Sequence, residues 1–188
     1  MTGESIQLVT QRISSCRLLV SEQENRWITA GPGLVIYLSF IASEDQSNLQ
    51  DRFEKIIKGI MTAKLATISG WNKDHSDAES IQGLLTSESI SMINLVVIPQ
   101  ATLAGKLKEG DKYLKYHRQL TRERGFELYS NFISMLSKFF NASCPPIDMA
   151  KNSTEPIPGR LCISWGTYGG RQGFEMVSTG PSTHFFQY

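Results

Sequence analysis

The sequence is poor in the residues from which metal sites and disulfide frameworks are built. Its 188 residues include three cysteines and three histidines. Cys16, Cys144 and Cys162 are odd in number and have no C-x-x-C spacing, so neither a disulfide framework nor a zinc site is indicated, and we expect a reducing compartment. The histidines stand in separate regions without H-x-x-x-H spacing. We expect no metal and no organic cofactor.

Motifs of several common enzyme classes are also missing. There is no G-x-S-x-G nucleophile elbow, and the glycine-rich stretch 166–173 (GTYGGRQG) lacks the G-K-[ST] ending of a phosphate loop, so we interpret it as a hairpin turn. The longest apolar run, residues 34–42, is far too short to cross a bilayer. The N-terminus has no basic region followed by an apolar core. We therefore expect a cytoplasmic protein without a membrane anchor.

The composition is that of an ordinary globular domain. Hydrophobic residues make up 40% of the chain and charged residues 20%, with a net charge of +1. A chain of this length can bury a substantial core without disulfides or metal. We expect a single domain over residues 1–188.

Strand-like patterns dominate the N-terminal part and recur before Pro99. Residues 6–20 alternate apolar and polar with one change of frame, which we interpret as a strand with a bulge. Residues 31–40 (GPGLVIYLSF) begin at a Gly-Pro-Gly turn and are then almost wholly apolar, as a central strand buried on both faces would be. Residues 93–99 (INLVVIP) form a further buried strand that ends at Pro99.

Two segments have helical periodicity instead. Between Glu44 and Met61 apolar residues recur at helical spacing, and Ser43 with Gln46 offers a capping box. After a loop over residues 104–123, a second helix is predicted with this apolar face: Phe126, Tyr129, Ile133, Leu136 and Phe140. Three short strand-like runs then end the chain. This order predicts an α+β fold of mostly antiparallel sheets with two main helices packed outside, and it leaves open whether the sheets close into a barrel-like arrangement.

The strand that ends at Pro99 leads into a polar turn. A strand that stops pairing at a proline leaves the next amides free to face a ligand or a developing oxyanion. Thr102 could be a nucleophile only if a base took its proton, and no such base is evident in the sequence. We favour main-chain donors at Gln100, Ala101 and Thr102, and keep attack by the Thr102 side chain as the alternative.

Positive charge is concentrated just after this turn. Residues 106–124 hold seven of the nineteen basic residues, with Tyr113 and Tyr116 among them. A flexible basic loop with aromatic residues suits a nucleic-acid backbone, although composition alone fits a solvated surface loop equally well. The candidate nucleic-acid contacts are Lys106, Lys108, Lys112, Lys115 and Arg118.

Four colinear motifs resemble the D-aminoacyl-tRNA deacylase family. They are the N-terminal strand LVTQRISSC, the strand end IPQATLAGKL, the helix GFELYSNFISML and the C-terminal TGPSTHF. Against that family, this chain has insertions near residues 71–90 and 141–158.

The resemblance implies a homodimer that hydrolyses the ester between a D-amino acid and the 3' adenosine of tRNA, recycling the tRNA without a cofactor. Gly180 and Pro181 of one subunit would enter the pocket of the other, where main-chain groups of residues 100–102 orient the carbonyl. Pro99, Leu103 and Thr183 would complete the substrate contacts. The Gly-Pro main chain would exclude an L side chain.

One departure points to a second branch of the family. Position 99 is proline where widespread members have serine, and PQATL with GPSTH resembles the animal-type branch, whose Gly-Pro is trans and which resembles an editor of L-alanine mischarged on threonine tRNA. That activity is the close alternative. A non-catalytic tRNA-binding dimer and a generic hydrolase of small esters are further alternatives.

Overall fold

The computed structural model describes residues 3–44, 48–66, 78–86, 92–140, 161–178 and 180–188. The main sheet has five strands, in spatial order β10 (Thr183–Gln187), β1 (Gly3–Ile13), β4 (Gly33–Ser43), β5 (Ile93–Pro99) and β8 (Leu161–Trp165). A second sheet has the order β3 (Arg26–Ala30), β2 (Ser15–Ser21) and β9 (Phe174–Val177). A short hairpin pairs β6 (Gly105–Lys106) with β7 (Lys115–Tyr116).

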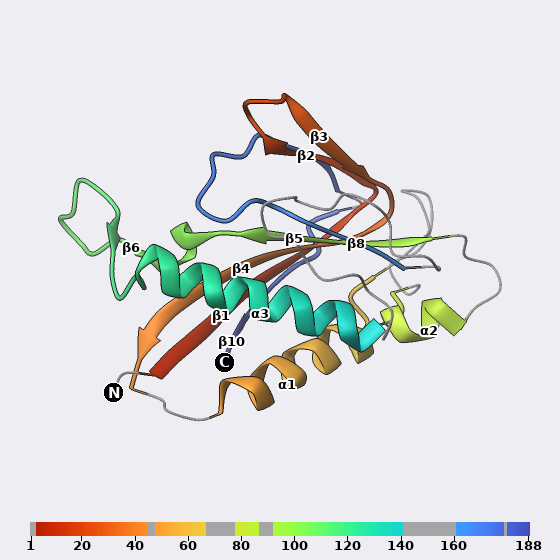
Figure 1. The fold of residues 1–188 in the computed structure, drawn as a ribbon, viewed down its shortest axis with the longest axis horizontal. Helices are drawn as coiled ribbons and strands as arrows, with labels where there is room; N and C mark the ends of the chain where they lie inside the picture. The colour runs from red at the N-terminus through yellow and green to blue at the C-terminus, as the bar shows by residue number, and fades with distance from the viewer. Residues whose placement is uncertain (1–2, 45–47, 67–77, 87–91, 141–160, 179) are drawn as a thin grey trace.

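Three helices complete the described part of the chain, with one 3-10 turn. The helices are α1 (Leu49–Thr62), α2 (Ile81–Thr86) and α3 (Arg122–Phe140), and the 3-10 turn is η2 (Ala101–Ala104). Figure 1 shows α1 and α3 on one side of the main sheet and the β2–β3 pair on the other. No helix of the described residues is both long enough and apolar enough to cross a membrane.

Two hydrophobic clusters fill the spaces between these layers. The larger lies between the main sheet and the helices. It includes Phe53 of α1 and Phe132 of α3, which pack edge to face with their ring centroids 5.4 Å apart. The smaller lies between the two sheets and includes Leu18, Val35 and Val96. Burial on both faces explains the almost wholly apolar sequence of β4, which is the central strand as predicted.

The α+β class is confirmed, with two qualifications. Five of the seven strand pairings are antiparallel, while β4–β5 and β5–β8 are parallel, so the main sheet is mixed. The sheets do not close into a barrel. The parallel pairings place the ends of β4 and β5 at the same edge, where Leu38 lies beside Pro99.

The frame change in residues 6–20 is a change of sheet rather than a bulge. β1 pairs with β4 in the main sheet, whereas β2, after a break at Ser14, pairs with β3 and β9 in the second sheet. Two successive strands on different sheets pack against different partners, so their apolar residues do not share one alternating frame. A bulge within one strand would produce the same shift in the apolar pattern. The sequence analysis also missed β3, a five-residue strand.

Three local predictions need correction. α1 begins at Leu49 and not at Glu44, and its cap is Asn48, whose Oδ1 accepts from the Gln50 N–H at 3.0 Å. Phe126 is 40% exposed, so it lies at the edge of the apolar face of α3. Residues 166–173 connect β8 to β9 on different sheets and are therefore not a hairpin turn.

The two expected insertions are covered only in part. Residues 141–158 lie outside the described residues, and 71–90 is described only over 78–86, which contains α2.

Candidate active site

The end of β5 presents two unpaired main-chain donors. The Gln100 N–H, which we expected to be free, donates to the Leu38 carbonyl at 2.8 Å, so the prediction was wrong for this residue. The Leu103 N–H donates to the Gln100 carbonyl at 3.1 Å. Between them, the N–H groups of Ala101 and Thr102 open the 3-10 turn and have no acceptor within the described part of the chain. Both residues are exposed. Two adjacent free N–H groups at a strand end can bind a carbonyl oxygen or an oxyanion.

Two side chains of this turn, Gln100 and Thr102, are hydrogen-bonded to each other. Nε2 of Gln100 donates to Oγ1 of Thr102 at 2.6 Å. No histidine, aspartate or glutamate lines either of the two pockets described below, as far as the described residues show. The Thr102 hydroxyl therefore has a neutral amide as its neighbour, and neither described pocket lining offers a base to take its proton.

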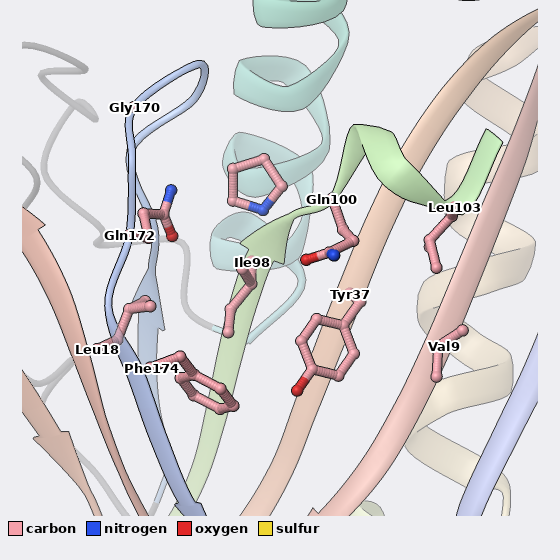
Figure 2. A pocket seen from close by; sticks show the side chains of 10 residues that line it. Val9, Leu18, Tyr37, Ile98, Gln100, Leu103, Gly170, Gln172 and Phe174 are labelled. Carbon is pink, nitrogen blue, oxygen red and sulfur yellow. The ribbon is translucent and has the colours of Figure 1, made fainter. Parts of the chain in front are cut away.

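One pocket, of about 560 Å³, lies on the side of the strand end that faces the second sheet; we call it the apolar pocket. Its apolar wall consists of Val9, Leu18, Tyr37, Ile98, Leu103 and Phe174, as Figure 2 shows. Tyr37 and Phe174 meet edge to face, with ring centroids 6.1 Å apart. Burial, and secondarily the neighbouring Cys16, raises the pKa of the Tyr37 phenol. At neutral pH this hydroxyl is uncharged.

A second pocket, of about 420 Å³, lies next to the start of α3; we call it the Tyr168 pocket. Its distinctive residues are Phe40, Gln119, Leu120, Arg122 and Tyr168. Ala101 and Thr102 also line it, whereas Pro99, Gln100 and Gly170 line both pockets. The strand end therefore lies between the two pockets, and the residues that carry the free amides line the Tyr168 pocket.

A buried tyrosine fixes the ends of the strands that carry these pockets. The hydroxyl of Tyr129, on α3, lies 3.0 Å from the Val97 carbonyl and 3.0 Å from the Gly166 carbonyl. Complete burial raises the pKa of this phenol well above its usual value, so it stays a hydrogen-bond donor. This contact links α3 to the ends of β5 and β8.

The Gly180 turn is held by Gln11 and Ser178, which the sequence analysis did not single out. Gln11, nearly buried on β1, donates through Nε2 to Oγ of Ser178 at 2.8 Å and to the Gly180 carbonyl at 3.3 Å. Thr183 donates to the side-chain oxygen of Gln11, and the Gly180 N–H donates to Ser178 Oγ at 3.2 Å. Gly180 has a φ of 123°, which disfavours any other residue. Gln11 lies within the LVTQRISSC motif, but the sequence does not show its role, because its partners are about 170 residues away.

Within one chain, only one of the two predicted groups of site residues lines a described pocket. Residues 99–103 all line at least one of the two described pockets. Gly180, Pro181 and Thr183 line neither pocket of their own chain. The peptide bond between Gly180 and Pro181 is trans, because no peptide bond of the described residues is cis.

The basic segment forms a hairpin that projects beside the start of α3 (Figure 1). Its predicted nucleic-acid contacts are all exposed: Lys106, Lys108, Lys112, Lys115 and Arg118. Asp111 organises the tip, since its carboxylate accepts from the Lys115 ammonium at 2.7 Å and from the Lys108 N–H at 3.1 Å. These bonds lower the pKa of Asp111, that to Lys115 being the larger cause. Lys115 is thus partly neutralised.

The tyrosines of the hairpin are exposed as well. Tyr113 is 81% exposed and Tyr116 is 45% exposed. The hairpin is tied to the main sheet where the Arg118 carbonyl accepts from the Ala42 N–H at 2.7 Å. The next residue, Gln119, lines the Tyr168 pocket, so the hairpin leads directly to that pocket. Among the described residues, no three His, Cys, Asp or Glu side chains are grouped as a metal site would require.

Comparison with known proteins gives a consistent result. The sequence profile of the D-Tyr-tRNA(Tyr) deacylase family matches residues 9–187. The chain is 31% identical over 163 residues to D-aminoacyl-tRNA deacylase 2 of Homo sapiens, covering 87% of this chain and 80% of that protein. It is 32% identical over 165 residues to D-aminoacyl-tRNA deacylase 2 of Gallus gallus, covering 88% and 82%.

A solved structure of a probable eukaryotic D-amino acid tRNA deacylase has a similar fold. The TM-score is 0.72 at 22% identity, covering 98% of this chain and all of the other. At that identity the likeness concerns the fold alone. The stretch matched by the family profile contains both the strand end at 99–103 and the turn at 180–183.

Proposed function

Because the chain belongs to the D-Tyr-tRNA(Tyr) deacylase family, we propose that it hydrolyses the ester between a D-amino acid and the 3' adenosine of tRNA at the end of β5. The observation that supports this site is the pair of free N–H groups on Ala101 and Thr102, which lies between two pockets. The protein is a hydrolase of aminoacyl-tRNA ester bonds and resembles the animal-type branch.

The chemistry needs little more than orientation and an oxyanion site. An aminoacyl ester is intrinsically labile, so donors placed where the carbonyl oxygen becomes negative can supply the main stabilisation, while water attacks. The Ala101 and Thr102 amides are fixed by the 3-10 turn and need no reorganisation. Neither described pocket lining contains a histidine, aspartate or glutamate, which fits a reaction without a side-chain base.

The two pockets differ in what they can hold. The Tyr168 pocket offers an aromatic ring and the Gln119 amide, which suit a nucleoside that stacks and forms hydrogen bonds. The apolar pocket suits the aminoacyl group. We therefore place the terminal adenosine beside Tyr168 and the scissile ester at Gln100–Thr102.

The active form in this proposal is a homodimer. Gly180 and Pro181 line neither of the two described pockets of their own chain, yet Gln11 and Ser178 hold Gly180 in a defined turn. A rigid turn without a local function is explained if it enters the partner's apolar pocket, where its main chain would exclude an L side chain. The exposed apolar side chains of β9 and β10 support a contact there: Met176, Val177 and Phe185.

The basic hairpin would bind the acceptor end of the tRNA. Residues 105–118 carry five basic and two acidic residues, a surplus of three positive charges. Its position next to Gln119 would guide the 3' end into the Tyr168 pocket. Aminoacyl-tRNA is used in the cytoplasm, which is where we place the protein.

L-alanine mischarged on threonine tRNA is the second candidate substrate. Pro99 and the trans peptide bond between Gly180 and Pro181 are the observations that favour it, because both agree with the branch that the sequence resembles.

Deacylation of three matched substrates by the purified protein tests the proposal. They are D-tyrosyl-tRNA, L-tyrosyl-tRNA and L-alanine carried on threonine tRNA. Cleavage of the first alone supports strict chiral proofreading, and cleavage of the third supports the second candidate. Silence on all three, with salt-sensitive tRNA binding retained, would leave the non-catalytic binding dimer. Cleavage of a simple aminoacyl ester at the rate of the tRNA esters would favour a generic esterase.

A further inference from the structure

Arg122 is the one charged residue among those that line the two pockets. The lining of the apolar pocket is uncharged, and the lining of the Tyr168 pocket contains Arg122 and no carboxylate within the described part of the chain. A ligand that spans both pockets therefore meets one positive charge at one end only.

The guanidinium of Arg122 is free to bind a ligand. No carboxylate of the described residues is in ion-pair distance of it, and its side chain is exposed. Arg124, two residues further on, differs in this respect, because its guanidinium is neutralised by Glu4 at 2.7 Å and Glu127 at 2.8 Å. Of these two neighbouring arginines, only the one at the pocket keeps its charge uncompensated.

A glycine makes room for this guanidinium at the pocket wall. A Cβ added to Gly169 would lie 2.9 Å from Nε and 3.3 Å from an Nη of Arg122, closer than van der Waals contact allows. Gly169 also has a φ of 70°, so its backbone conformation favours glycine independently of the contact with Arg122. The guanidinium thus rests against bare main chain beside Tyr168, at the mouth of the pocket.

The substrate carries charges of opposite sign at its two ends. Its aminoacyl group has an α-ammonium, which a neighbouring arginine would repel. The anion nearest to the ester is the phosphodiester on the 5' side of the terminal adenosine. A planar guanidinium forms paired, charge-assisted hydrogen bonds with phosphate oxygens.

We propose that Arg122 binds the phosphodiester that joins the terminal adenosine to the preceding nucleotide, and so positions the substrate with its adenosine beside Tyr168 and its aminoacyl group toward the apolar pocket. This inference rests on the proposed function. It adds a positioning residue at a named group of the substrate and assigns the direction in which the substrate crosses the strand end.

The test compares two minimal esters that differ by this one phosphodiester. The first is the aminoacyl ester of the dinucleotide CpA, and the second is the same ester of adenosine alone. The variants are Arg122→Gln, Arg122→Lys and, as a matched loss of charge at the far end of the same helix, Lys138→Gln, which is also exposed. Circular dichroism and thermal unfolding check that each variant is folded.

For the CpA ester, we expect Arg122→Gln to raise KM about tenfold with little change in kcat, because the contact is remote from the reacting carbonyl. The adenosine ester should be cleaved equally by wild type and Arg122→Gln. Arg122→Lys should recover part of the loss, and Lys138→Gln should match wild type on both esters. Gly169→Ala should resemble Arg122→Gln, since its methyl group displaces the guanidinium.

Two results would overturn the inference while leaving the proposed function intact. One is an equal effect of Arg122→Gln on both esters, which would indicate a structural role. The other is a wild-type KM that does not distinguish the two esters. Failure of wild-type protein to cleave either ester or any aminoacyl-tRNA would instead count against the proposed function itself.

Discussion

The side-chain amide of Gln100 donates a hydrogen bond of 2.6 Å to the hydroxyl of Thr102, across a turn whose two intervening N–H groups have no acceptor in the described structure. The two side chains are thus hydrogen-bonded to each other, while the main-chain N–H groups remain available to a ligand. This arrangement separates two possible mechanisms. Attack by the Thr102 hydroxyl would need a base in place of a neutral amide, whereas an oxyanion site needs only the free N–H groups.

Substitutions at adjacent residues distinguish these mechanisms. Thr102→Val keeps the shape and removes the hydroxyl, so we expect most of kcat to remain. Ala101→Pro removes one N–H at the first position of the 3-10 turn, where proline is tolerated, and should lower kcat by about 100-fold or more. Single-turnover kinetics measure both. Complete loss of chemistry in Thr102→Val, with tRNA binding intact, would restore the threonine as a nucleophile.

If each active site is shared between two subunits, two inactive variants should restore activity when they form mixed dimers. Gly180→Ala should inactivate the partner's pocket, because the residue has a φ of 123° and its main chain would enter that pocket. Mixing Ala101→Pro with Gly180→Ala subunits, after unfolding and refolding together, should restore about a quarter of wild-type activity, since half of the dimers are mixed and each has one intact site. Each homodimer alone is the control. No recovery in the mixture, despite mixed dimers seen by mass spectrometry, would mean that the two motifs act within one chain.

The predicted subunit contact is tested at Phe185. This side chain lies opposite Val9 in the β1–β10 pairing, on the same face as Tyr37, and is 57% exposed. Phe185→Glu would place a charge in an apolar contact and should give a monomer in light scattering, with loss of deacylation. Leu114→Glu, at a residue that is 56% exposed on the hairpin, should leave the oligomeric state unchanged. A monomeric wild-type protein that is fully active would contradict the model of a shared site.

The hairpin should contribute affinity for tRNA and not chemistry. Reversing two exposed charges, Lys108→Glu with Lys112→Glu, should weaken tRNA binding and flatten its dependence on salt, because fewer counterions are released. Cleavage of the adenosine ester should not change. The same reversal at Lys55 and Lys58, exposed on α1, serves as the control. Equal losses in both double variants would show that net charge, not the hairpin, governs binding.

Stability should fall at alkaline pH through Cys16. Burial between the sheets raises the pKa of this thiol from 9.0 to about 11. A raised folded-state pKa favours the protonated thiol, so its contribution to stability is complete below pH 9 and is lost as pH rises through about 11. Urea unfolding between pH 7 and 11 should show this decline. Cys16→Ala should be less stable throughout but less sensitive to pH. The remaining slope comes from the other groups whose pKa burial raises: Tyr37, Tyr129, Cys162 and Tyr168. An unchanged slope in Cys16→Ala would exclude its thiol as a source.

Much of the fold was predictable because the relevant physics is local. Apolar periodicity located the strands β4 and β5 and most of α1 and α3, and the β-branched run after the Gly-Pro-Gly turn indicated a strand buried on both faces. The free amides of Ala101 and Thr102 were also predictable from the strand end at Pro99. The Gln100 N–H was expected to be free as well, but it keeps a ladder partner in the Leu38 carbonyl. The family resemblance came from the same short motifs.

Other features depended on which segments meet in space. The frame change near Ser14 is a step from one sheet to another, which alternation alone cannot distinguish from a bulge. Gln11 and Ser178 meet at the Gly180 turn although about 170 residues separate them, and Arg122 meets Gly169 at a pocket wall. The sequence by itself determined most of the elements, their class and the open main chain after Pro99, because these follow from neighbours along the chain. Only the tertiary structure decided which pockets flank that main chain and which arginine keeps a free charge beside them, because packing between distant segments sets both.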